Sequence, residues 1–116
     1  LHTLKAPPPH KPARSSDERQ QVERGHRIFA KNRCVECHVP PLTFTTQGTF
    51  DVGLTDEAGN RKFNPPSLRG VGQQDRLLHD GRARSLEEVF TNHGHQLQED
   101  LSPQELADLV RYLRSL

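Results

Sequence analysis

Apolar positions recur at helical spacing near both ends of the chain. In the first stretch Val22, Gly25 and Phe29 fall on one face, which predicts a helix over about residues 16–32. This stretch begins with Ser-x-x-Glu at residues 15–18, the capping-box pattern that starts helices. The predicted helix ends just before the first cysteine of the chain.

The last stretch of the chain shows the same arrangement. Residues 102–105 read Ser-Pro-Gln-Glu, which combines a capping box with proline at the first helical position. The apolar residues that follow at helical spacing are Leu106, Leu109, Val110 and Leu113. They predict a helix that continues to about residue 115 and buries one apolar face.

The middle of the chain has weaker patterns. Ser-x-x-Glu at residues 85–88 predicts a short helix over about residues 86–92. Its expected apolar face consists of Leu86, Val89, Phe90 and His93. Residues 40–66 contain three glycines and lack helical periodicity, so we expect a long loop with room for a short hairpin. A short helical piece is expected over residues 67–72.

Composition limits the classes of protein to consider. Of the 116 residues, 31% are hydrophobic and 5% aromatic, which is little apolar material for the core of a domain. A buried apolar cofactor would supply the missing surface, and a partly disordered chain would show the same composition. The net charge of +1, without a basic stripe, argues against nucleic-acid binding, and no apolar run has transmembrane length.

The chain divides by composition into two parts. Residues 1–15 contain four prolines with Lys and His between them, which predicts a Pro-rich linker or tail. Residues 16–116 have the length of one domain. Because the chain begins at Leu1 and contains no methionine, we expect a processed form or a domain cut from a longer protein.

Both cysteines lie in the pentapeptide Cys34-Val35-Glu36-Cys37-His38. Two thiols one helical turn apart can add to the two vinyl groups of a porphyrin, and His38 can then bind the iron as its proximal ligand. We therefore predict one covalently bound haem c. Attachment of this kind takes place outside the cytoplasmic membrane, so we expect a bacterial periplasmic, cell-surface or secreted protein whose export signal has been removed.

Three other kinds of site use paired cysteines. A redox dithiol usually lies in a βαβ context, and no such pattern surrounds this pair. A zinc site needs two further ligands at matching spacing; the seven histidines leave this open, although none forms a His-x₃₋₅-His pair suited to it. A local disulfide is the third alternative. The histidine at the fifth position favours haem.

A glycine and two aromatic residues connect the terminal helices to a known fold. Gly25 and Phe29 precede the cysteines, and Tyr112 lies in the last predicted helix. This pairing resembles the class I cytochromes c, whose N- and C-terminal helices cross at a glycine against aromatic residues. The resemblance implies an all-α, cytochrome c-like monohaem domain with crossed terminal helices and a long loop after the haem motif.

Several further motifs occur together after the pentapeptide. They are Phe-Thr-Thr at residues 44–46, Phe-Asp-Val-Gly at 50–53, Phe-Asn-Pro-Pro-Ser-Leu-Arg-Gly-Val at 63–71, His-Asp-Gly-Arg at 79–82 and Ser-Leu-Glu-Glu-Val at 85–89. From about residue 25 to 116 the chain resembles the C-terminal, electron-transfer haem domain of bacterial di-haem cytochrome c peroxidases. Those enzymes carry two haems in two domains, whereas this chain has one attachment motif. The resemblance therefore implies the electron-relay half without the catalytic half.

The distal ligand of the iron cannot be methionine, because the chain has none. In the family that the chain resembles, a Met before a glycine takes this place, and here that position is His93, followed by Gly94. We expect His93 as the distal ligand, with His95 and then His79 as alternatives. A bis-histidine iron would be low-spin and of lower potential than a Met-ligated one.

Supporting residues are expected around the haem. Arg69 and Arg82 are candidate partners of the haem propionates, since a guanidinium matches the geometry of a carboxylate. Pro40 follows His38 closely, and its carbonyl is a candidate acceptor for the N–H of the proximal imidazole.

These expectations favour an electron carrier over an enzyme. A single low-potential haem c would pass electrons to or from a redox partner protein, or a fused domain tethered by the Pro-rich tail, and we expect a monomer. The alternatives are a small haem enzyme, peroxidase-like or acting on sulfur compounds, and a haem-based sensor with a labile sixth ligand. An enzyme would need an acid–base group near the iron, for which His79 and His95 are candidates.

Overall fold

The computed structural model describes residues 11–40, 44–46, 48–53, 55, 57–78, 80–97 and 99–116. Its elements in chain order are α1 (Ser16–Lys31), the 3₁₀ turn η1 (Cys34–Glu36), β1 (Phe50–Asp51), β2 (Lys62–Phe63), the 3₁₀ turn η2 (Val71–Gln73), α2 (Leu86–Thr91) and α3 (Pro103–Arg114). The protein is mostly helical with a small two-stranded sheet, which is consistent with the expected cytochrome c-like fold but does not confirm a purely all-α class.

The terminal helices form where the sequence predicted them. The side chain of Ser15 accepts a hydrogen bond from the Glu18 backbone N–H, and Ser102 and Glu105 form both bonds of a capping box at α3. Each helix therefore has its first turn closed by residues next to it in the sequence. This local origin explains why the predicted helix bounds are confirmed to within one residue.

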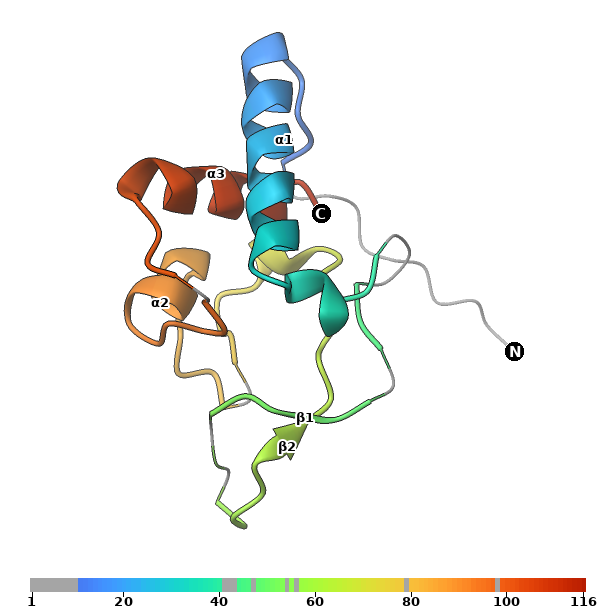
Figure 1. Ribbon diagram of the computed structural model, residues 1–116, viewed down its shortest axis with the longest axis vertical. Coiled ribbons are helices and arrows are strands. Elements are labelled where there is room, and N and C mark those ends of the chain that lie inside the picture. The colour runs from blue at the N-terminus through green and yellow to red at the C-terminus, as the bar shows by residue number, and fades with distance from the viewer. Residues whose placement is uncertain are drawn as a thin grey trace, which may run out of the picture.

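The two terminal helices cross at Gly25, as Figure 1 shows for α1 and α3. A Cβ atom on Gly25 would lie 2.1 Å from the Asp108 carbonyl oxygen and 2.5 Å from Tyr112 Cβ, so only glycine fits. The Phe29 and Tyr112 rings fill the adjacent space, with centroids 5.4 Å apart. The crossing of a glycine against aromatic residues is therefore present.

An ion pair with a buried carboxylate and a half-exposed arginine reinforces this crossing. Asp108 of α3 is 3% exposed, and its carboxylate accepts hydrogen bonds from Arg24 Nε of α1 at 3.1 Å and from Gln104 at 2.8 Å. Burial alone would raise the pKa of Asp108. The hydrogen bonds from Arg24, Gln104 and Gln21 together lower it by more than burial raises it, so the pKa lies below its usual value.

The remaining elements are short. In β1 and β2, Phe50 pairs with Phe63 and Asp51 with Lys62, so the long loop does contain a hairpin. The turn η2 lies at the end of the segment where a helical piece was expected. Helix α2 ends at Thr91 with Asn92 as its C-cap, and His93 is exposed beyond it. The prediction that His93 lies on the apolar face of this helix is therefore wrong.

The first described residues lie against the C-terminal helix. The Lys11 N–H donates to the Arg114 carbonyl at 2.9 Å, and Arg111 donates to the Lys11 carbonyl at 2.7 Å. Residues 1–10 of the predicted Pro-rich tail lie outside the described residues. In the described part of the chain, no helix is both long enough and apolar enough to cross a membrane.

Candidate haem site

The turn η1 places both thiols at the end of α1. Asn32 closes α1 through its side-chain amide, which donates to the Ile28 carbonyl at 3.0 Å, and Arg33 then takes a left-handed conformation at φ 64°. The N–H of His38 donates to the Cys34 carbonyl at 2.9 Å. This single tight turn holds Cys34, Cys37 and His38 together.

The two cysteines are free thiols whose pKa values are raised. Burial is the main cause in both, and it raises the pKa of Cys34 to about 11. Reactive dithiols instead have lowered thiol pKa values. The pair therefore lacks the electrostatic signature of a redox dithiol and does not form a local disulfide.

The ring of His38 is oriented by two backbone carbonyls. Its Nδ1 lies 3.0 Å from the carbonyl oxygen of Phe44 and 3.1 Å from that of Pro66. Because a carbonyl oxygen only accepts, Nδ1 must carry the proton and donate, which leaves the lone pair on Nε2 free. Burial lowers the pKa of His38 and so favours the neutral ring. These two carbonyls take the place that the sequence suggested for the carbonyl of Pro40.

A cavity of about 580 Å³ opens beside this turn, within the size range of small-molecule sites, roughly 300–1,000 Å³. Cys34, Cys37 and His38 line it on one side. Most of the remaining wall is apolar and comes from every part of the fold, including Phe29, Phe50, Phe63, Val71, Phe90 and Leu113. The cavity is therefore the place where residues distant in the sequence meet.

A second histidine lines the same cavity. Gly94, at φ 53°, turns the chain back over α2, and the N–H of His95 donates to the Val89 carbonyl at 3.1 Å. Gln96 then donates to the Val52 carbonyl at 3.2 Å, which ties this turn to the hairpin side. Burial, and to a lesser extent the charge of His38, lower the pKa of His95 to about 4. His95 is therefore neutral at ordinary pH.

Comparison with known proteins agrees with this geometry. A family model described as di-haem cytochrome c peroxidase matches residues 10–115. The chain belongs to this family. The match confirms the resemblance drawn from the motifs, and it makes haem c the cofactor type to test against the cavity. No curated protein matches the chain.

The residues of this di-haem cytochrome c peroxidase family member fit haem c. The cavity is apolar, as a porphyrin requires; two unpaired thiols lie at its wall; and His38 presents Nε2 with its other nitrogen held by carbonyls, the arrangement usual for a metal-binding histidine. Among the described residues, no group of three or more His, Cys, Asp or Glu side chains is arranged to hold a metal ion. A zinc site in this part of the chain is therefore not supported.

The other predicted site residues are not among those that line the cavity, or lie outside the described residues. The Arg69 guanidinium lies 4.8 Å from the centroid of the Phe44 ring. Arg82 is exposed and forms an ion pair with Asp80 at 2.8 Å. His93 is exposed and is not among the residues that line the cavity, and His79 lies outside the described residues.

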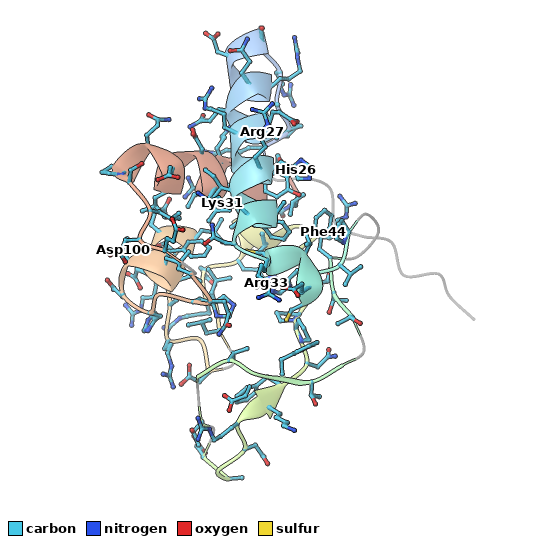
Figure 2. The ribbon with its side chains drawn as sticks, viewed as in Figure 1. His26, Arg27, Lys31, Arg33, Phe44 and Asp100 are labelled. Atoms are coloured by element: carbon cyan, nitrogen blue, oxygen red, sulfur yellow. The ribbon has the colours of Figure 1, made fainter. Side chains whose placement is uncertain are left out.

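Two cationic residues that the sequence did not single out do line the cavity. They are Arg33, at the turn between α1 and η1 (Figure 2), and Arg76, which also donates to the Gly81 carbonyl at 3.4 Å. Arg33 also pairs with Glu36 at 2.8 Å. These guanidinium groups could meet the carboxylates of a bound haem. The position of Arg33 next to Cys34 is the only sequence signal that could have indicated either.

Proposed function

We propose that this chain is a single-haem electron-transfer domain of the di-haem cytochrome c peroxidase family. Cys34 and Cys37 would hold the haem c through thioether bonds, and His38 and His95 would be the two ligands of its iron. One observation carries the proposal: these four side chains line the same apolar cavity, although His95 is far from the others in the sequence.

The choice of His95 over His93 rests on placement and charge. His95 is half-buried in the cavity wall, and its low pKa leaves the imidazole neutral, so it has a lone pair to offer a metal. His93 is exposed on the other side of Gly94. To reach the cavity, His93 would have to displace the turn that the His95 N–H bond to Val89 closes.

Two imidazole ligands decide which chemistry the site favours. A bound haem c supplies one-electron redox chemistry, and its potential follows its axial ligands. With His38 and His95 as its two ligands, the iron would not be open to peroxide. Imidazole ligands give a lower potential than a Met/His pair, which supports a carrier of electrons with a low potential rather than a peroxidase.

The location and the partner follow from the same proposal. Covalent haem attachment outside the cytoplasmic membrane supports a periplasmic, cell-surface or secreted protein. A monohaem domain must exchange electrons with another protein, either a separate redox partner or a domain joined to the Pro-rich segment before residue 16. A monomer is sufficient for this role.

Two alanine variants test the distal ligand and the function together. The ferric wild type should give a low-spin spectrum that His93→Ala leaves unchanged, whereas His95→Ala should give a high-spin spectrum and rapid cyanide binding. A high-spin spectrum in His93→Ala alone would assign the distal position to His93.

The same measurements distinguish a carrier from an enzyme. A wild-type protein that is low-spin and slow to react with peroxide supports electron transfer. The family name favours a peroxidase as the second candidate. A high-spin wild type that consumes peroxide would support that candidate, with His95 as an acid–base group near the iron.

A further inference from the structure

Phe44 has an unusual backbone conformation for a bulky residue. Its φ is 54°, in the left-handed region that disfavours side chains with a Cβ. In this conformation its carbonyl oxygen lies 3.0 Å from Nδ1 of His38. A strained residue persists only where its surroundings hold it, so the question is what holds Phe44.

The Phe44 ring is held on two sides. It is 5% exposed and packs edge-on against Phe29, with ring centroids 6.2 Å apart and planes at 68°. The guanidinium of Arg69 lies over the ring at 4.8 Å from its centroid, within the range of a cation–π interaction. Phe44 therefore lies between Phe29, near the end of α1, and Arg69, in the segment after β2. Figure 2 shows Phe44 beside the end of α1.

The second acceptor of His38, the Pro66 carbonyl, lies in a segment that is hydrogen-bonded to the segment of Phe44. The Asn64 amide donates to the carbonyls of Thr46 at 2.7 Å and Gly48 at 2.9 Å, and the Thr45 hydroxyl donates to the Pro65 carbonyl. These bonds join the segment that carries Phe44 to the segment that carries Pro66. The carbonyls of Phe44 and Pro66, which both accept from the single N–H of His38, are therefore held in place relative to each other.

We propose that Phe44 and Arg69 are positioning residues that set the donor strength of His38. This inference rests on the proposed role of His38 as an iron ligand. Arg69, by stacking on Phe44, keeps the Phe44 carbonyl aimed at Nδ1, and the forked hydrogen bond gives the imidazole more anionic character. A more basic ligand stabilises ferric over ferrous iron and lowers the reduction potential.

The test compares Arg69→Leu with Arg69→Lys in the haem-loaded protein, by potentiometric titration. Arg69→Leu removes the cation and should raise the midpoint potential, by about 59 mV if the ferric-to-ferrous ratio at fixed potential falls tenfold. Arg69→Lys keeps a cation and should lie between Arg69→Leu and the wild type. Arg84→Leu, which removes an exposed arginine, is the matched control and should leave the potential unchanged.

Phe44→Leu extends the test to the ring itself. It removes the stacking surface for Arg69 and should raise the potential at least as far as Arg69→Leu. The Nδ1 proton resonance of His38 in the ferrous protein should shift in the same order, because it reports the hydrogen bond directly. If Phe44→Leu fails to fold, the comparison of Arg69→Leu with Arg69→Lys still tests the proposal.

The outcomes separate this inference from the proposed function. A low-spin, covalently bound haem whose potential is the same in Arg69→Leu, Arg69→Lys and the wild type would overturn the positioning role and leave the electron-transfer function standing. If the His38→Ala variant had the same iron spectrum as the wild type, the proposed ligand set itself would be wrong.

Discussion

Phe29 and Tyr112, where α1 crosses α3, are 2% and 7% exposed, whereas Phe50 and Phe63 of the β1–β2 hairpin are only half-buried. The crossing is filled by a glycine, aromatic rings and a buried carboxylate, and of its two aromatic rings only Phe29 also lines the cavity. The hairpin faces a cavity that no side chain fills. In Figure 1 the crossing lies in the upper half of the molecule and the hairpin near its lower end.

This difference shows how a chain with few hydrophobic residues can build a domain. Its own apolar side chains suffice for the helix crossing, and the loop side depends on the apolar surface of a cofactor. The two regions should therefore respond differently when the cofactor is lost, when the crossing is disrupted, and when single hydrogen bonds are removed.

The largest effect should follow from replacing both thiols, as Cys34→Ser with Cys37→Ser. Loss of the covalent haem should remove more than about 4 kcal/mol from the free energy of unfolding, because the apolar wall of the cavity would face water. Hydrogen-exchange mass spectrometry should show β1 and β2 losing protection while α1 and α3 keep part of theirs. Equal loss in all four elements would mean that the crossing does not stand on its own.

A substitution at the crossing should have the next largest effect. Gly25→Val places side-chain atoms where a Cβ already lies 2.1 Å from a carbonyl oxygen, and overpacking of this kind costs about 3 kcal/mol. Urea unfolding measures the cost, with the exposed Ala30→Val as a control for the helix propensity of valine. A Gly25→Val protein as stable as its control would refute the close packing of the crossing.

Replacing the buried carboxylate by Asp108→Asn should cost about 1–2 kcal/mol at neutral pH, since Arg24 is itself half exposed and screened by water. The folded pKa of Asp108 is lowered, so its contribution is present above the unfolded pKa and is lost as the pH falls through the folded pKa. The difference from wild type should therefore shrink below about pH 4. The exposed Glu23→Gln is the control, and a difference independent of pH would contradict the assignment to this carboxylate.

The crossing could be predicted from the sequence because its signals are local. Ser-x-x-Glu at the helix starts, proline at the first position of α3 and the glycine-to-aromatic spacing of α1 each act within a few residues. These residues fix helices whose apolar faces then have to meet. The pentapeptide is local in the same sense, and its turn does bring Cys34 and His38 together.

The surroundings of the pentapeptide could not be predicted in this way. Helical periodicity placed His93 on a buried face only because it extended the predicted helix past Thr91, where α2 ends. In the structure Gly94 has a left-handed conformation, and the chain reverses there so that His95 lines the cavity. The acceptors of His38 are backbone carbonyls six and 28 residues along the chain, and a carbonyl leaves no mark in the sequence. Arg76 reaches the cavity through tertiary folding and belongs to no motif.

Two serine caps give the smallest and most selective test. Ser85 and Ser102 each accept a hydrogen bond from the backbone N–H three residues on, at 3.1 Å in both, and removing either cap should cost about 1 kcal/mol. Ser102→Ala acts on α3 and should lower stability with no change in the iron spectrum. Ser85→Ala loosens α2, whose last turn holds His95, and should also raise the rate of cyanide binding to the ferric protein. The two variants lose the same kind of bond, one in α2 and the other in α3. Equal cyanide rates in the two variants would therefore show that α2 does not control the distal ligand.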